Sequence, residues 1–402
     1  MIHPSSRRAS GPLNSRPAFL FVRDNRGVRD FFANPRDGAP QGSRDARATR
    51  FHMTIPGYAP TQLAQAPLTA AALGLERLYV KLEVERFGLP SFKVLGASWA
   101  TCRALSVHAG LDEPVATFGR LQTLAAQLGD VTLVAATDGN HGRAVARMAR
   151  LLGLRARILV PEDMAVARVD ALRSEAADVQ IVHGDYDDAV AASAALASDS
   201  ALVISDTSWE GYREVPAWVA DGYGTIFAEL EHQLRDPFEL VAVQIGVGAL
   251  ASAVVRALAA PGRFILGVEP ADADCALRAV RDGEHARAPG PHRSVMVGLN
   301  CGSVSPLALP ELRAGIDAFC AVDDDAVATS VRALLEDDLT CGETGAAGVA
   351  GLVALREAWA QDSWTRLGVS AAPSALAICT EAPTDPESFR RIAGAGEPAP
   401  AA

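Results

Sequence analysis

The chain has 402 residues, of which 49% are hydrophobic, and its formal net charge is −11. This length is typical of two or three compact units, and no run of about 18 apolar residues predicts a membrane span. Because the chain is acidic and its arginines are scattered along it, we expect no nucleic-acid partner.

Residues 1–45 are rich in arginine, and we expect this arm to be largely flexible, with a short strand near Phe19 to Val22. Residues 393–402 consist mainly of Ala, Pro and Gly and predict a flexible tail. Between them, short β-type apolar runs alternate with alanine-rich segments of helical spacing, which predicts βαβ units and parallel sheets. We expect strands at 77–83, 131–136, 156–161, 179–183, 201–205, 240–245, 264–268, 318–322 and 374–379.

The cysteines are far apart in the sequence and form neither a Cys-x-x-Cys pair nor a cluster with histidines, so the sequence predicts no metal site. We expect them to be reduced thiols in a cytoplasmic protein: Cys102, Cys275, Cys301, Cys320, Cys341 and Cys379.

Lysine is rare in this chain, because Lys81 and Lys93 are the only lysines among 37 basic residues. Arginine can replace lysine as a surface cation, but its guanidinium cannot lose a proton and attack a carbonyl group. Lys93 follows a Gly/Pro/Ser loop at an expected helix start, where the helix dipole disfavours the protonated amine. We therefore expect Lys93 to be a nucleophile and Lys81 to occupy a half-exposed structural position.

Three further motifs directly follow expected strands, where parallel sheets bind their ligands. Thr137-Asp-Gly-Asn140-His-Gly is either an ordinary turn or a ligand loop. Gly246-Val-Gly248 is either a tight turn or a cup of backbone N–H groups that holds a phosphate. Asp206 either caps a helix or serves as a general acid or base.

Taken together, these motifs resemble the fold-type II enzymes of pyridoxal 5′-phosphate (PLP), the tryptophan synthase β family, and within it the diaminopropionate ammonia-lyases. The resemblance covers roughly residues 50–392. Its motifs are Arg86-Phe-Gly-Leu-x-x-Phe-Lys93, Thr137-Asp-Gly-Asn-His-Gly-Arg143, Asp206-Thr-x-Trp-Glu-Gly-Tyr212, Gly246-Val-Gly248, Val268-Glu-Pro270, Gly298-Leu-x-Cys-Gly302, Gly342-Glu-x-Gly-Ala346 and Thr380-Glu-x-x-Thr-Asp385.

The resemblance implies an α/β fold with two parallel-sheet domains and the cofactor in the cleft between them. The large, PLP-binding domain would be discontinuous, comprising residues 46–95 and 220–392, and residues 96–219 would form the smaller α/β domain. The resemblance also implies a homodimer. Four positions depart from the family pattern and bear on the choice of substrate more than on cofactor binding: Ala249, Asn300, Cys341 and Ala382.

The resemblance also implies a cofactor site. Lys93 would hold PLP through its amine, with Phe92 beside the cofactor ring and Asn140 bonded to the 3′ oxygen. A neutral partner, either Cys379 or Thr380, would face the pyridine nitrogen. Backbone amides of the glycine-rich loop would hold the phosphate, and this loop comprises Gly246, Val247, Gly248, Ala249 and Leu250.

Asp138 stands where hydroxyamino-acid dehydratases usually carry a small or hydroxyl residue. In the lyases, a carboxylate at this place goes with the use of both isomers of 2,3-diaminopropionate. Lys93 would remove the Cα proton of the L-isomer, and Asp138 that of the D-isomer. Asp206 would bind the distal ammonium or serve as an acid or base.

The implied reaction is the PLP-dependent elimination of 2,3-diaminopropionate to pyruvate and two molecules of ammonia. One alternative keeps PLP but acts by β-elimination or β-replacement on serine, threonine or a substituted alanine. A more distant alternative is a PLP-binding protein without catalytic activity. The presence of Lys93, Asp138 and Asp206 argues against this last reading.

Overall fold

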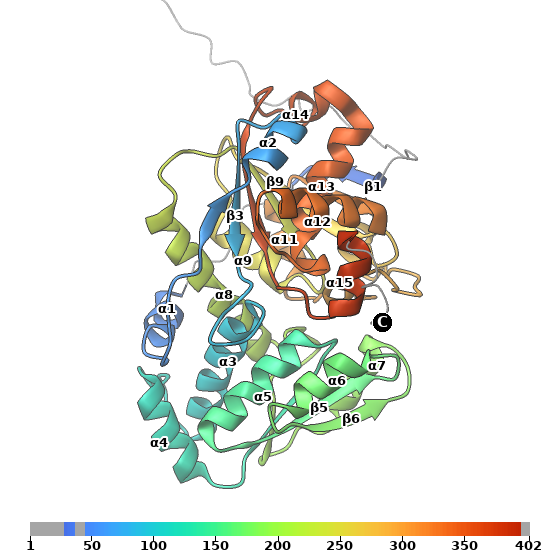
Figure 1. Cartoon of the computed structure of the whole chain (residues 1–402). Coiled ribbons are helices and arrows are strands. Elements are labelled where there is room, and N and C mark those ends of the chain that lie inside the picture. Colours follow the sequence, from blue (N-terminus) through green and yellow to red (C-terminus); the bar gives the residue numbers. More distant parts are fainter. Residues whose placement is uncertain (1–27, 37–44, 395–402) are drawn as a thin grey trace, which may run out of the picture.

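The structure, a computed structural model, describes residues 28–36 and 45–394 and contains two β-sheets flanked by helices (Figure 1). The larger sheet has the strand order β1-β10-β9-β8-β11-β3-β2, and the smaller has the order β6-β5-β4-β7. The predicted strand near Phe19 and the predicted tail from Ala395 onward lie outside the described residues. Within them, no helix is long and apolar enough to cross a bilayer.

The larger sheet comprises β1 (Val28–Ala33), β2 (Leu63–Gln65), β3 (Arg77–Leu82), β8 (Leu240–Gln244), β9 (Phe264–Pro270), β10 (Ala318–Val322) and β11 (Ser374–Cys379). The smaller sheet comprises β4 (Thr132–Ala136), β5 (Arg155–Pro161), β6 (Asp178–Val182) and β7 (Ala201–Val203). All nine predicted strands are therefore present.

The helices that flank the sheets fall into a longer group of 9 to 20 residues and a shorter group of 4 to 8 residues. The longer ones are α3 (Lys93–His108), α4 (Phe118–Leu128), α5 (Asn140–Leu152), α7 (Tyr186–Ala194), α8 (Glu214–Gln233), α9 (Ala249–Leu258), α12 (Asp324–Glu336) and α13 (Glu343–Trp359). The shorter ones are α1 (Ala46–His52), α2 (Pro67–Leu73), α6 (Val166–Arg173), α10 (Cys275–Arg281), α11 (Leu309–Gly315), α14 (Ser363–Arg366) and α15 (Pro386–Ala393).

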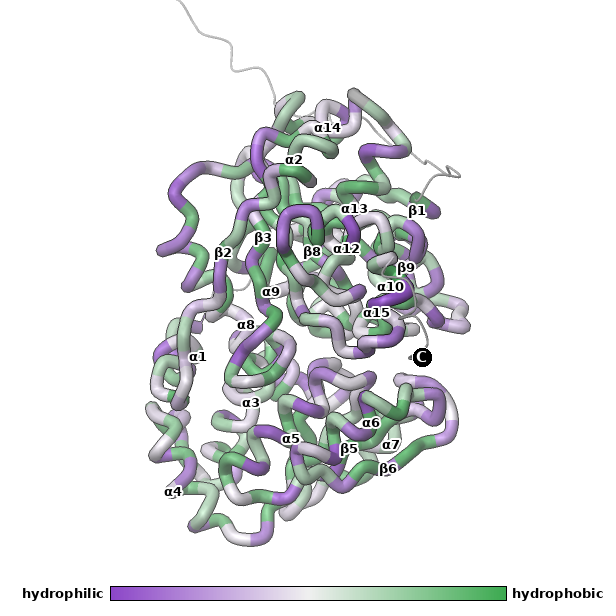
Figure 2. The backbone as a smooth tube through the Cα atoms, viewed as in Figure 1, coloured by the Kyte–Doolittle hydropathy of each residue, from purple (hydrophilic) through white to green (hydrophobic). Residues whose placement is uncertain are grey.

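Parallel pairing joins every strand of the smaller sheet and the five inner strands of the larger one. Strands β8 and β11 are buried along their whole length, as expected for parallel strands covered on both faces. Figure 2 shows the hydrophobic segments gathered in the strands and inner helices, and hydrophilic segments along the outer loops. The predicted α/β fold is confirmed.

Strand β1 corrects the prediction for the N-terminal arm. It pairs antiparallel with β10 at the edge of the larger sheet, and its Val28 and Phe31 are buried. Residues 28–33 of the arm therefore belong to the fold instead of being flexible. The short β2, which no apolar run predicted, pairs antiparallel with β3 at the opposite edge.

Helices α3 and α8 lie between the two sheets and pack closely on each other (Figure 1). A Cβ atom on Gly96 would lie 2.6 Å from the Tyr223 ring, and one on Gly222 would lie 2.4 Å from the Leu95 carbonyl oxygen. Glycine at both positions therefore allows α3 and α8 to approach this closely. The contact holds the first turn of α3, which begins at Lys93, in place. The predicted domain boundaries after residues 95 and 219 fall inside these two helices. We propose that the larger domain comprises residues 46–95 and 220–392 and the smaller one residues 96–219.

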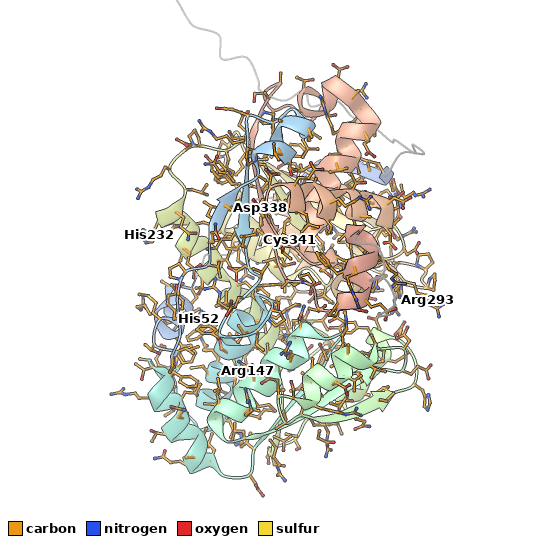
Figure 3. All side chains as sticks on the ribbon, in the orientation of Figure 1. His52, Arg147, His232, Arg293, Asp338 and Cys341 are labelled. Carbon is orange, nitrogen blue, oxygen red and sulfur yellow. A yellow bond between two sulfur atoms is a disulfide. The ribbon has the colours of Figure 1, made fainter. Side chains whose placement is uncertain are left out.

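His52 ties α1 to both of these helices (Figure 3). Its Nε2 lies 3.0 Å from the Leu95 carbonyl oxygen and its Nδ1 lies 2.7 Å from the Thr225 hydroxyl. Burial lowers the pKa of His52 to about 3, so the ring is neutral. A neutral ring that donates from Nε2 and accepts at Nδ1 satisfies both contacts.

Lys81 is not half-exposed as predicted, because its side chain is fully buried. Its Nζ donates to Glu229 at 2.7 Å, to the Thr61 carbonyl oxygen at 2.8 Å and to Gln233 at 2.9 Å. Glu229 also accepts from Arg86, which precedes the Lys93 loop. A buried ammonium requires such partners, so Lys81 serves the fold.

Candidate active site

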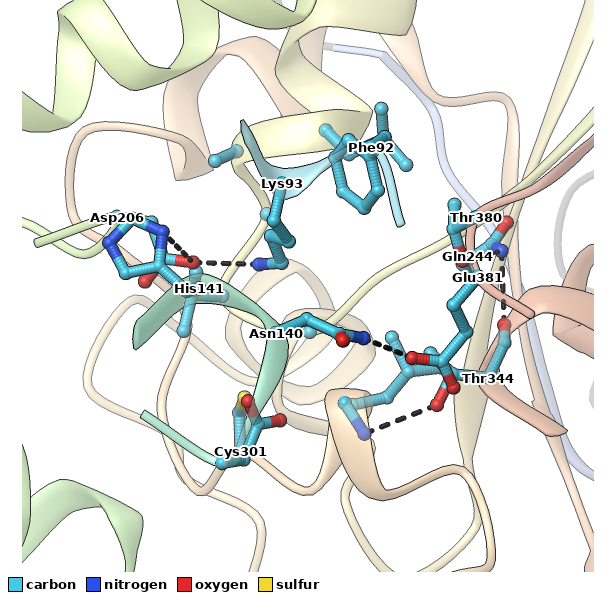
Figure 4. Close-up of a pocket in the computed structure, with 18 of the residues that line it drawn as sticks. Phe92, Lys93, Asn140, His141, Asp206, Gln244, Cys301, Thr344, Thr380 and Glu381 are labelled. Atoms are coloured by element: carbon cyan, nitrogen blue, oxygen red, sulfur yellow. Dashed lines mark hydrogen bonds and ion pairs between the residues drawn. The ribbon is translucent and has the colours of Figure 1, made fainter. Parts of the chain in front are cut away.

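A pocket lies at the carboxyl ends of strands from both sheets (Figure 4). Of the twelve residues predicted for the site, eleven line this pocket, and Cys379 does not. The pocket also contains residues that were not predicted to belong to the site: His141, Arg168, Tyr186, Gln244, Gly298, Leu299, Cys301, Thr344 and Glu381. The fold thus brings together segments that lie more than 280 residues apart in the sequence.

Lys93 and Asp206 form an ion pair in this pocket, with 2.8 Å between Nζ and Oδ2 (Figure 4). Burial, the largest single effect, would lower the pKa of Lys93, but the charge of Asp206, its hydrogen bond with Lys93 and the charges of neighbouring groups together outweigh burial and raise the pKa. Burial would likewise raise the pKa of Asp206, and the charge of Lys93 holds it below its usual range instead. The predicted lowering of the Lys93 pKa by the helix dipole is therefore wrong in this structure.

Two other side chains face Asp206. The Tyr186 hydroxyl donates to its Oδ1 at 3.2 Å. His141 Nδ1 lies 4.0 Å from its Oδ2, while His141 Nε2 donates to the Ile204 carbonyl oxygen at 2.7 Å. Burial lowers the pKa of His141, so the ring is neutral and Nδ1 carries a lone pair. Asp206 therefore has an amine, a phenol and an imidazole around it, a set that can hold or pass a proton.

Thr137 shapes the loop that carries Asp138 and Asn140. Its Oγ1 accepts from the N–H groups of Gly139 and Gly142, both at 2.9 Å. Gly139 has a φ of 147°, and a Cβ on Gly142 would lie 2.4 Å from the Thr137 methyl group. Glycine at both positions allows this turn, which directs Asp138 and Asn140 into the pocket.

Burial raises the pKa of Asp138, and the positive charge of Lys93 opposes this. Asn140 donates from Nδ2 to Glu381, a buried carboxylate on the opposite wall of the pocket (Figure 4). Burial likewise raises the pKa of Glu381. The pocket thus holds three carboxyl groups, Asp138, Asp206 and Glu381, of which Lys93 pairs directly with one.

The glycine-rich loop fits a phosphate. Gly248 caps α9 with a φ of 100°, and a Cβ there would lie 2.8 Å from that of Ala308. A Cβ on Gly246 would lie 3.2 Å from the Gly298 carbonyl oxygen. Because the first N–H groups of a helix have no acceptor within the helix, the start of α9 offers donors to an anion. With Lys93 in the same pocket, the residues present fit PLP.

Gln244 fixes the direction of the hydrogen bond at Thr380. Its Nε2 is surrounded by the carbonyl oxygens of Thr344 and Ile378, each at 3.0 Å, and by Thr380 Oγ1 at 2.8 Å. An amide nitrogen accepts no hydrogen bond, so Thr380 keeps its own hydroxyl proton free to donate. Thr380 can therefore donate a hydrogen bond to an unprotonated pyridine nitrogen of PLP.

Cys379 lies one residue earlier and is joined to Cys341 by a disulfide (Figure 3). Expecting only reduced thiols is therefore wrong for this pair, and Cys379 cannot serve as a thiol partner of the cofactor. The four other cysteines are free and buried: Cys102, Cys275, Cys301 and Cys320. The disulfide connects the end of β11 to the start of α13 beside the pocket.

Comparison with known proteins agrees with this geometry. A family of sequences described as "Pyridoxal-phosphate dependent enzyme" matches residues 54–368. The diaminopropionate ammonia-lyase of Escherichia coli is 33% identical over 365 residues, which are 87% of this chain and 91% of that protein. The chain belongs to the diaminopropionate ammonia-lyase family. As a member of this fold-type II family, it uses PLP as its cofactor.

Two further comparisons show how far the similarity of this family member extends to a lyase structure and to a dehydratase. The crystal structure of the Escherichia coli lyase in complex with D-serine has a TM-score of 0.83 and 31% identity, and covers 92% of this chain and 98% of that one. The biosynthetic L-threonine dehydratase of Haemophilus influenzae is 29% identical, but only over 58% of this chain and 45% of that protein. The similarity to the lyase is thus the more extensive one.

Proposed function

We propose that this chain catalyses the elimination of 2,3-diaminopropionate, as either isomer, consuming one water and releasing pyruvate and two molecules of ammonia. The observation that carries this proposal is the presence of Lys93, Asp138 and Asp206 in one pocket. When bound, PLP withdraws electrons from the substrate and so makes its Cα proton removable. The residues of this chain then have to supply a base for that proton and an acid for the leaving amine.

Lys93 and Asp138 are the two bases of this proposal. Lys93 accepts the Cα proton of the L-isomer, and Asp138 accepts that of the D-isomer. A buried carboxyl group with a raised pKa is a stronger base than an exposed aspartate, which suits Asp138 to this task. Two bases from different elements, one at the start of α3 and one before α5, would explain the use of both isomers.

Asp206 serves the leaving amine. Ammonia is a poor leaving group unless it is protonated, so the distal nitrogen of the substrate has to leave with a proton. Asp206 binds this nitrogen as an ammonium and, together with the Tyr186 hydroxyl that donates to it, keeps a proton at that place. Phe92 would lie beside the cofactor ring, Asn140 would bind its 3′ oxygen, residues 246–250 would hold its phosphate, and Thr380 would donate to its ring nitrogen.

The assembly and location of the protein remain predictions. We propose a homodimer, as the family resemblance implies, and a cytoplasmic protein whose substrate is a small amino acid. Size-exclusion chromatography with light scattering measures the mass of the particle. A mass near twice the 42.0 kDa of the chain supports the dimer, and a mass near 42.0 kDa contradicts it.

The first experiment is an absorbance spectrum of the purified protein with PLP. A near-visible band that borohydride abolishes is expected from Lys93 holding the cofactor. Pyruvate release from D- and L-diaminopropionate, L-serine and L-threonine then separates the candidate reactions. Turnover of diaminopropionate supports the proposal, whereas turnover of serine or threonine alone would show a dehydratase. Absence of turnover with all of them would favour a PLP-binding protein without catalytic activity.

A further inference from the structure

Arg168 lies between the active-site pocket and a second, outer cavity. It belongs to α6 in the smaller sheet's layer and, with Asp138 and Tyr186, is one of three residues that line both cavities. The outer cavity is lined by the segment between β5 and α6, including residues 163–165, and by a segment that follows α10, including residues 291–295. Because the two cavities share these three residues, Arg168 stands at their junction.

The contacts of Arg168 are made to the loop that carries Asp138. Its NH1 group donates to the Asp138 carbonyl oxygen at 3.2 Å. A Cβ atom on the next residue, Gly139, would lie 3.7 Å from Arg168 Cδ, so the side chain covers the turn. Thr137 Oγ1 holds the same turn from within the loop, through the N–H groups of Gly139 and Gly142. The backbone of Asp138 is thus held between Thr137 and Arg168.

The charge of Arg168 also reaches Asp138. Burial raises the pKa of the Asp138 carboxyl, and the positive charges of Lys93 and Arg168 oppose this rise, while Asp206 adds to it. The same charge opposes the rise that burial causes in the pKa of Glu381. The other titratable groups that interact with Asp138 are Tyr223, His141, Tyr186, Cys301 and Glu381. Of the two cations, Lys93 can lose its proton during turnover, whereas a guanidinium cannot.

We propose that Arg168 is a positioning residue for Asp138. Arg168 fixes the turn at Asp138 and Gly139, and it supplies a permanent positive charge beside the carboxylate that acts on the D-isomer. This inference rests on the proposed function of Asp138 as a base. Arg168 supports one of two bases, so its loss has an unequal effect on the two isomers. A residue that only stabilised the fold would affect both isomers alike.

The test compares Arg168→Met and Arg168→Lys with the parent enzyme, using kcat/KM for each isomer between pH 5 and 9. For Arg168→Met, the acid limb of the D-isomer profile is expected to move up by about one pH unit, which lowers kcat/KM at pH values below that limb by about tenfold. The L-isomer should change less than about threefold. Arg168→Lys keeps the charge, so its acid limb should return toward that of the parent enzyme.

Arg173→Met is the matched control, because Arg173 lies on the same helix and forms an exposed ion pair with Asp170. It should leave both profiles unchanged. Equal losses for both isomers without a shift of the acid limb would overturn the proposal. A rise in KM for both isomers with an unchanged pH profile would also overturn it, because Arg168 would then bind the substrate carboxylate.

A second measurement uses the apoprotein and does not depend on turnover. An aspartate whose pKa is raised by folding destabilises the folded state progressively as pH rises from its unfolded value of about 3.9 to its folded one. Removing Arg168 extends this loss to higher pH, so the unfolding temperature of Arg168→Met should fall increasingly below that of the parent as pH rises above about 4.

In an Asp138→Asn background, this pH dependence of the Arg168→Met effect should shrink to the part that Arg168 exerts through Glu381. The same pH dependence in both backgrounds would show that Arg168 acts elsewhere and would overturn the proposal. If the parent enzyme releases no pyruvate from diaminopropionate, the proposed function fails, but this comparison of apoproteins still decides the role of Arg168.

Discussion

Replacing Asp206 by asparagine removes the charge that faces Lys93 and should make the amine far more reactive. Two unit charges 2.8 Å apart interact by about 6 kcal/mol at an effective dielectric constant of about 20. This energy corresponds to about four pKa units. Water and the remaining dipoles take over part of it, so we expect the pKa of Lys93 in Asp206→Asn to fall by at least about two units.

The scarcity of lysine makes this shift measurable in the apoprotein. Acylation of amines by acetic anhydride, followed by mass spectrometry, reports on Lys93 and Lys81 separately. At pH 8, Lys93 should react about 100-fold faster in Asp206→Asn than in the parent, because only the neutral amine reacts. Lys81, which is fully buried and paired with Glu229, is the internal control. Asp163→Asn, on the rim of the outer cavity, is the matched variant.

A rate ratio near one for Lys93 would refute this reasoning. It would show that the Asp206 carboxylate does not set the protonation of the amine, and that burial or the helix dipole controls it instead. A comparable rise in the Asp163→Asn variant would point to a general effect of negative charge around the pocket. Either result would remove the basis for the Lys93 and Asp206 pair described above.

Three further predictions concern the cofactor, the disulfide and pH. Lys93→Arg should lose both the near-visible absorbance and turnover, because a guanidinium cannot hold the cofactor. Lys81→Arg should keep the absorbance. A near-visible band in Lys93→Arg would contradict the assignment of Lys93 as the residue that holds PLP. The disulfide closes a 38-residue loop between Cys341 and Cys379 and should stabilise the fold by about 4 kcal/mol. Dithiothreitol should therefore lower the unfolding temperature of the parent. It should not lower that of a Cys341→Ser, Cys379→Ser double variant. Burial raises the pKa of Glu269 from its usual value of 4.5 to about 8, so the folded state should lose stability as pH rises from about 5 to 8. Glu269→Gln should remove this part of the pH dependence of thermal unfolding, and an unchanged pH dependence in this variant would contradict the prediction.

The strands and the pocket were largely predictable, because both depend on local patterns. A buried parallel strand is a short apolar run, and the residues after such strands meet at one edge of a sheet. This is why Asp138, Asp206 and Gly246 could be placed together from the sequence. Edge strands carry no such pattern: β1 contains Arg29 and Asp30, and its pairing with β10 depends on residues about 290 positions away.

Other site residues could not be predicted because their environment is tertiary. Gln244 lies within a predicted apolar strand, so the sequence predicts a strand residue there and not a pocket residue. Glu381 lies next to Thr380, and the sequence alone does not show that its side chain enters the pocket. His141 was within a quoted motif, yet nothing local shows that its ring faces Asp206. The full burial of Lys81 depends on Glu229, which is 148 residues away. Pairing of Cys341 with Cys379 likewise follows from the approach of α13 to β11, which no spacing in the sequence reveals.

The measurement that tests the central claim most directly is the ratio of kcat/KM for D- and L-diaminopropionate in Asp138→Asn and in the parent enzyme, followed as pyruvate release. If Lys93 and Asp138 are separate bases in one pocket, Asp138→Asn should lose D-isomer activity by about 100-fold or more, while L-isomer activity falls far less. Equal losses for the two isomers, or an unchanged ratio, would contradict the two-base account.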